Sequence, residues 1–194
     1  TIFGVSFMTL APEHELVSQL TSPEQKEAVD AYIDATSRRS ERERMAEVKR
    51  VSGVFTGSYA KHPLTGERIP IWIGDYVLAG YGTGAVMAVP CGDQRDFDFA
   101  TQFGLPIPNI FEGVSITDGA YEEKNDVVIA NSGFASGLPH KEAVTRVIEA
   151  LEASGKGKGT INFRLRDAVF SRQRYWGEPF PVYYDNDGLP RLLP

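Results

Sequence analysis

Several short segments of the chain are mainly apolar and contain β-branched or aromatic residues, a pattern typical of β-strands. The first such segment, "TIFGVSFMTLA" at 1–11, is rich in β-branched and aromatic residues and is predicted to be a strand. Further strands are predicted near 69–73, 75–79 and 85–89, with a short one at 127–129.

Other segments repeat their apolar residues at helical spacing and carry helix start and stop signals. Ser22 is a suitable N-cap, and Pro23 occupies the first position of the helix that follows it. Asp93 can cap a second helix, which Gly104 can end. The predicted helices are 22–39, the highly charged and solvated 40–51, 93–104, and the amphipathic 139–154.

Many short strands with a few helices predict an α+β fold in which helices surround a β-barrel-like core. The polar segment 112–126 is expected to be hairpin-like, and "GKGKG" at 155–159 to be a flexible linker. The segment from 160 to 184 is strand-like, basic and aromatic.

Composition narrows the class of protein further. The 194 residues carry a net charge of −6, which argues against a free-standing nucleic-acid binder. Cys91 is the sole cysteine and the three histidines are far apart, so we expect a reducing, cytoplasmic location and no metal site. No apolar run is long enough to span a membrane, and we expect no signal peptide. Because Thr1 begins inside a predicted strand, we expect a fragment of a longer protein.

The stretch "YGTGAVMAVPCGDQRDFDFA" at 81–100 places a cluster of charges directly after an apolar strand. One interpretation is a glycine turn, a core strand and first-turn acids that cap a helix. The other is a small-molecule pocket, in which Met87 and Val89 form the wall, Asp96 binds a cation, and the glycines admit a close approach. The spacing alone leaves both open.

The same stretch resembles the editing domain of bacterial leucyl-tRNA synthetase, in which a Gly-Thr-Gly strand precedes a "DQRD" segment. Further resemblances are "HPLTGERIPIW" (62–72), "NSGFASGL" (131–138) and "INFRLRDAVFSRQRYWGEPFPV" (161–182). The resemblance implies an editing core at 1–160, and a connector at 161–194 that returns to the synthetase catalytic core.

The resemblance also implies an activity. The domain would hydrolyse the aminoacyl ester of leucine tRNA mischarged with a noncognate aliphatic amino acid. Its implied partners are the 3′ end of leucine tRNA and the rest of the parent synthetase, with no membrane, as a monomer. The ATP-dependent adenylation of the parent enzyme has no signature in this chain, and no cofactor is expected in this domain.

Site residues follow from the resemblance one by one. Asp96 matches the aspartate that pairs with the substrate α-amino group, and Thr1 matches the threonine that sterically blocks leucine. Met87 and Val89 match the pocket wall of the family. Tyr81 and Thr83 match positions that contact the terminal adenosine or the amino acid. Asp93 and Arg95 match partners that hold the loop.

One departure concerns Cys91 and Gly92, which stand where the family has Gly-His. No pocket histidine is therefore available as a general base at that position, and water is the expected nucleophile. Cys91 is interpreted as a spectator, His62 as structural and His140 as exposed. The alternatives are an editing domain of isoleucyl or valyl type, and a non-catalytic tRNA-binding module.

Overall fold

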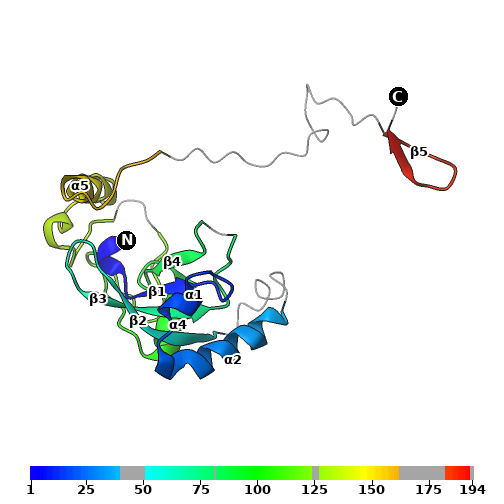
Figure 1. The fold of residues 1–194 in the computed structure, drawn as a ribbon. Helices are drawn as coiled ribbons and strands as arrows, with labels where there is room; N and C mark the ends of the chain where they lie inside the picture. The colour runs from blue at the N-terminus through cyan, green and yellow to red at the C-terminus, as the bar shows by residue number, and fades with distance from the viewer. Residues whose placement is uncertain (40–50, 81, 124–126, 162–181, 193–194) are drawn as a thin grey trace. The chain divides into compact units, whose positions relative to one another are not determined.

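The structure is a computed structural model that describes residues 1–39, 51–80, 82–123, 127–161 and 182–192. The chain divides into two compact units, Thr1–Gly159 and Thr160–Pro194. The helical elements are η1 (Ile2–Gly4), α1 (Val17–Leu20), η2 (Pro23–Gln25), α2 (Lys26–Ser37), α4 (Gln94–Phe103), η3 (Gly133–Ala135) and α5 (His140–Ala153) (Figure 1). The strands are β1 (Phe7–Leu10), β2 (Gly53–Lys61), β3 (Arg68–Gly74), β4 (Ala85–Ala88), β5 (Val182–Tyr184) and β6 (Pro190–Leu192).

The first unit is built on a four-stranded mixed sheet with the order β2-β3-β1-β4. Strand β1 runs parallel to β3 and antiparallel to β4, and β2 runs antiparallel to β3. The predicted mixture of helices and strands is confirmed. The predicted barrel is not seen, because closure requires the edge strands to pair. Among the described residues β2 and β4 remain the two edges of an open sheet.

Side-chain alternation along the strands gives the sheet two buried faces. Met8 and Leu10 point to one face, where they pack with Ile71 and Val29 beneath α1 and α2. Phe7 points to the other face, where α4 covers it. Phe99 of α4 stacks on Phe7 with ring centroids 4.8 Å apart. Helices therefore cover both faces of the sheet.

Local signals placed α4 correctly. Asp93 caps its N-terminus by accepting hydrogen bonds from the backbone N–H groups of Arg95 and Asp96. Gly104 ends it in the left-handed conformation, with φ of 64°. The helices predicted at 22–39 and 139–154 are also present, as η2 with α2 and as α5. The helix predicted at 40–51 lies almost wholly outside the described residues.

Several strand predictions are wrong. Residues 1–11 begin with η1 before β1 starts, and 75–79 is a turn rather than a strand. The backbone N–H of Asp75 binds the Tyr32 hydroxyl and that of Val77 binds the Gly74 carbonyl, so these donors do not face a neighbouring strand. Segment 127–129 forms isolated bridges only, and the described part of 112–126 forms no hairpin.

In the second unit, β5 and β6 pair as an antiparallel hairpin. Most of the predicted connector at 161–194 lies outside the described residues, so its role remains a prediction.

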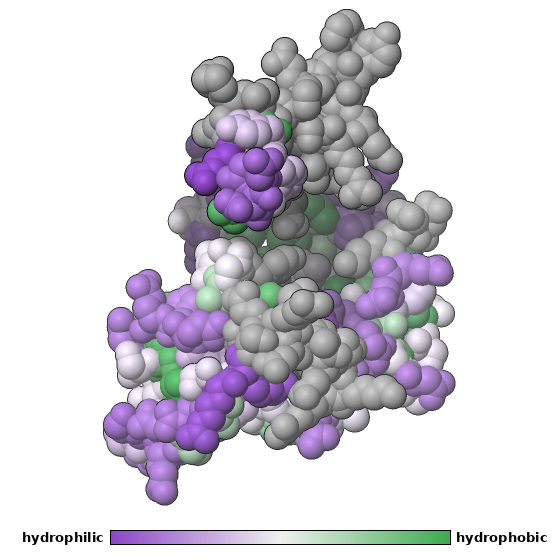
Figure 2. Space-filling view, turned by 90° about the vertical axis from the view of Figure 1, so that its right-hand side faces the viewer, coloured by the Kyte–Doolittle hydropathy of each residue, from purple (hydrophilic) through white to green (hydrophobic). Residues whose placement is uncertain are grey.

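Across the described part of the chain, no helix is both long enough and apolar enough to cross a membrane. Among the residues that Figure 2 colours by hydropathy, most of those visible on this face are hydrophilic, and hydrophobic atoms occupy smaller areas.

Candidate functional site

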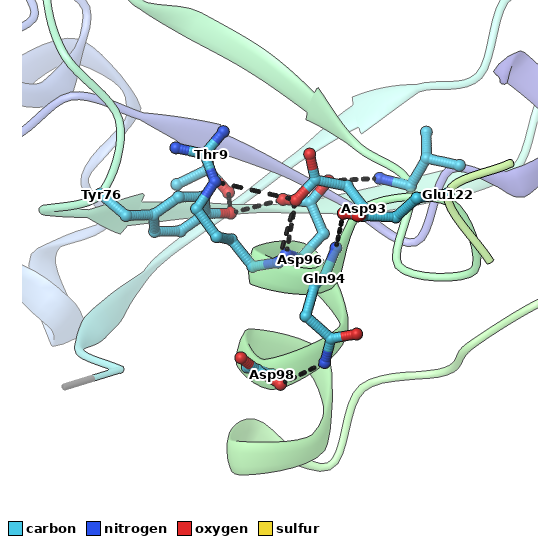
Figure 3. Close-up of polar contacts among 9 residues, drawn as sticks. Thr9, Tyr76, Asp93, Gln94, Asp96, Asp98 and Glu122 are labelled. Carbon is cyan, nitrogen blue, oxygen red and sulfur yellow. Dashed lines mark hydrogen bonds and ion pairs between the residues drawn. The ribbon is translucent and has the colours of Figure 1, made fainter. Parts of the chain in front are cut away.

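Asp96 lies in the first turn of α4 and is 6% exposed. One carboxylate oxygen, Oδ2, accepts the backbone N–H of Val89 at 2.8 Å. The other, Oδ1, accepts the Tyr76 hydroxyl at 2.9 Å, and that hydroxyl also lies 3.2 Å from Thr9 Oγ1 (Figure 3). An ionised carboxylate offers about four lone-pair positions, so two remain for a further donor.

Burial shapes the protonation of this cluster. It raises the pKa of Asp96 above the usual aspartate range, while the bonds from Val89 and Tyr76 oppose that rise. Among the charges nearby, Asp93 raises the Asp96 pKa and Arg95 lowers it. Burial, followed by the charge of Asp96, raises the pKa of Tyr76, so the tyrosine remains a hydrogen-bond donor at physiological pH.

The remaining charges around the helix start are more exposed. Arg95 Nε lies 3.9 Å from Asp93 Oδ1, with the Arg95 side chain mostly and the Asp93 side chain partly in solvent. Asp98 accepts a hydrogen bond from Gln94 at 2.8 Å on the surface of α4 (Figure 3). Exposed pairs of this kind contribute little to stability, so the organised part of the cluster is the set around Asp96.

A cavity of about 280 Å³ lies between η1, the end of β4 and α5. Its wall is apolar apart from Thr1, Ser132 and His140. The full lining is Thr1, Ile2, Phe3, Met87, Ile110, Ile129, Ser132, Ala135, His140, Ala143, Val144, Val147, Ile148 and Leu151. This volume is slightly below the usual range for small-molecule pockets, about 300–1,000 Å³, and suits a small aliphatic group.

The structure brings two predicted site residues, Thr1 and Met87, together at this cavity. Val89 lies in the adjoining apolar core, and its backbone connects that core to Asp96. Asp96 itself does not line the cavity. Its partner Thr9 lies on the α4 face of the sheet, whereas Met87 points to the opposite face.

The other predicted residues lie elsewhere. Thr83 is exposed, its hydroxyl donates to the Ala85 carbonyl at 3.2 Å, and its own carbonyl is bonded to the His14 ring. Asp93 and Arg95 belong to the cap of α4. Tyr81 falls outside the described residues.

Sequence reasoning missed Tyr76 and Thr9 as partners of Asp96, and the α5 side chains as cavity wall. His140 was expected to be exposed, yet it is half-buried and lines the cavity. The apolar stripe of α5 was a usable signal for a buried face. Nothing local indicated Tyr76, whose partner is 20 residues away.

Cys91 is fully buried in the apolar core next to Val89. Burial raises the pKa of its thiol, which disfavours the nucleophilic thiolate. No cluster of metal-ligating side chains occurs among the residues that the structure describes.

Comparison with known proteins agrees with the leucyl type of resemblance. The family described as "Leucyl-tRNA synthetase, editing domain" matches residues 1–152. The leucine–tRNA ligase of Christiangramia forsetii is 68% identical over 193 residues, covering 100% of this chain and 20% of the relative. That of Parabacteroides distasonis is 53% identical over 203 residues, covering 100% and 21%.

A solved structure is also similar: the ternary complex of Agrobacterium radiobacter K84 agnB2 LeuRS, tRNA and LeuAMS. Its TM-score is 0.61 at 32% sequence identity, with 99% of this chain and 21% of that chain covered. The chain thus spans about a fifth of the length of the relatives it matches. It belongs to the family of leucyl-tRNA synthetase editing domains.

Proposed function

We propose that the chain is the editing segment of a leucine–tRNA ligase and hydrolyses the ester that joins a noncognate aliphatic amino acid to the 3′ end of leucine tRNA. One observation carries this proposal within the family. Thr1 and Met87 both line the largely apolar cavity, and the volume of this cavity suits an aliphatic side chain. Hydrolysis needs no cofactor in this domain, and the parent ligase acts in the cytoplasm.

The physical need for such a site is clear. A hydrophobic synthetic site separates amino acids that differ by one methylene by only about 1–3 kcal/mol. A second site that admits the wrong acid and excludes leucine supplies the missing selectivity. Thr1 at the cavity wall is the group that would exclude the γ-branch of leucine.

Asp96 is the proposed anchor for the α-amino group. The noncognate amino acid of the mischarged tRNA would lie across the end of β4. Its side chain would enter the cavity, and its ammonium group would bind the free lone pairs of Asp96. Held in this way, the ester would be oriented for attack by water, and orientation would supply most of the rate. Backbone N–H groups at the strand end and a ribose hydroxyl of the substrate would assist.

Asp96→Asn tests this role without destroying the cluster. The asparagine oxygen can accept the Val89 N–H while its amide donates to Tyr76, whose hydroxyl then turns to Thr9. Folding raises the Asp96 pKa, so the protonated carboxyl group favours the folded state. This contribution to stability is lost as the pH rises through the folded-state pKa and the group ionises. The neutral variant should therefore fold at pH 7 at least as well as the parent.

The measurement is deacylation of isoleucyl- and valyl-tRNALeu by the intact ligase, with folding followed by circular dichroism. Losing one partner of a close charge pair costs about 2–5 kcal/mol, so Asp96→Asn should be at least about 30-fold slower. The matched control is Asp98→Asn on the surface of the same helix, which should deacylate normally. Normal deacylation by Asp96→Asn would refute the anchor, and a parent ligase inactive on every mischarged tRNA would favour a binding module.

A further inference from the structure

His62 lies in the turn between β2 and β3 and is 4% exposed. Its Nδ1 atom lies 3.2 Å from the backbone nitrogen of Leu64 and 3.0 Å from that of Thr65. A backbone N–H can only donate, so Nδ1 accepts both bonds and carries no proton. The ring is therefore neutral, with its proton on Nε2.

The protonated Nε2 donates to the Ile2 carbonyl of η1 at 2.9 Å, across 60 residues of sequence. The same carbonyl also accepts the Val5 N–H at a longer distance, 3.4 Å. The Phe3 ring packs near the imidazole, with ring centroids 6.0 Å apart. His62 thus holds η1 through the Ile2 carbonyl, although His62 does not itself line the cavity.

The other end of η1 is fixed by close packing. A Cβ added to Gly4 would lie 3.0 Å from Val89 Cγ1, so this end of the turn has almost no room to move. The carbonyl of Ile2 is held by His62 near the opposite end, next to Thr1. Within the same turn, the Thr1 carbonyl accepts the Gly4 N–H at 2.8 Å, so a shift of the Ile2 carbonyl would also move Thr1 at the cavity.

We infer that His62 is a positioning residue for Thr1: its bond to the Ile2 carbonyl sets how far η1 reaches into the cavity, and so which aliphatic side chains can enter. The inference rests on the proposed function, because it assigns His62 a part in the exclusion of leucine. A purely structural histidine would instead stabilise only the turn at 62–67, through its Nδ1 bonds.

Two substitutions separate these roles, because each keeps one half of the imidazole. In His62→Asn, Oδ1 takes the place of Nδ1 and keeps the turn, while the bond to Ile2 is lost. In His62→Gln, Nε2 takes the place of the ring Nε2 and keeps the bond to Ile2, while the turn loses its acceptor. The two variants are thus each other's control.

The assay is deacylation of leucyl-tRNALeu relative to isoleucyl-tRNALeu by the intact ligase, alongside thermal unfolding. His62→Asn should raise that ratio about 2- to 12-fold, the range that one neutral hydrogen bond represents, and its unfolding temperature should fall only by the loss of that one bond. His62→Gln should unfold at a lower temperature and keep the parent ratio. A parent ratio in the asparagine variant, or an equal rise in both variants, would overturn the inference.

Two further measurements complete the test. Nitrogen-15 NMR of His62 in the unaltered chain should show a protonated Nε2 and an unprotonated Nδ1; the opposite tautomer would overturn the inference even if the asparagine variant does not fold. Thr1→Ala, assayed in parallel, tests the proposed function itself. If Thr1→Ala leaves the ratio unchanged, the proposed exclusion of leucine by Thr1 is wrong. If Thr1→Ala raises the ratio and His62→Asn does not, only the positioning role of His62 is wrong.

Discussion

Tyr76→Phe removes one hydroxyl from the Asp96 cluster and keeps the ring that packs against Phe99. The hydroxyl donates to the charged form of Asp96 and therefore stabilises that form. Without it, the pKa of Asp96, which burial already raises, should rise further. Since an ammonium group binds only the ionised carboxylate, the acidic limb of the deacylation profile should move to higher pH.

The magnitude follows from the burial of the cluster. A hydrogen bond to a charged group contributes about 1.5–3 kcal/mol. Asp96 is only 6% exposed, so water should replace the lost donor poorly and most of this range should apply. Below the acidic limb, deacylation should be about 10- to 150-fold slower than in the parent, because each 1.4 kcal/mol is a factor of ten. Above the limb the two rates should converge.

The assay is the pH dependence of kcat/KM for isoleucyl-tRNALeu. Tyr32→Phe is the matched control: Tyr32 is a half-buried tyrosine whose hydroxyl binds Ser52 and the Asp75 N–H, and burial raises its pKa to about 12. This control should keep the parent profile. A Tyr76→Phe profile that keeps the parent limb, or is lowered equally at every pH, would show that the Tyr76 hydroxyl does not stabilise the ionised form of Asp96.

Three further predictions concern other parts of the domain. Thr1→Ala in the intact ligase should hydrolyse leucyl-tRNALeu about tenfold faster or more, since steric overlap in a packed site costs about 1–3 kcal/mol; equal and negligible rates would place leucine exclusion elsewhere. Cys91, fully buried with a raised thiol pKa, should resist alkylation in the native state, and Cys91→Ala should keep its deacylation rate; a large loss of rate would contradict the spectator role. The 194-residue chain, with a net charge of −6, should bind tRNA weakly at physiological salt, which a titration giving sub-micromolar affinity would disprove.

The helix α4 was predictable from sequence because its start and end depend on neighbours in the chain. Asp93 caps groups two and three residues away, and Gly104 supplies the left-handed conformation at the end. The turn at 75–79 was not predictable in this way. The N–H of Asp75 is bonded to a hydroxyl 43 residues away, and this contact overrides the local strand pattern.

In the candidate site, too, some residues could be predicted from the sequence and others depend on contacts between distant parts of the chain. Resemblance to the family indicated Thr1 and Met87, which the structure brings to one cavity. The groups that hold the site in place act across long separations: Tyr76 reaches Asp96 over 20 residues, and His62 reaches Ile2 over 60. Neither separation leaves a periodic signal in the sequence, so these partners emerge only once the chain is folded.

A double-mutant cycle between enzyme and substrate tests most directly whether Asp96 binds the α-amino group of the mischarged amino acid. The two changes are Asp96→Asn in the ligase and N-acetylation of isoleucyl-tRNALeu, which removes the substrate's positive charge. Each change alone should slow deacylation by the loss of a close charge pair, about 2–5 kcal/mol, and the second should add almost nothing once the first is made. Fully additive losses would show that Asp96 and the amino group do not interact, and would rule out Asp96 as the anchor.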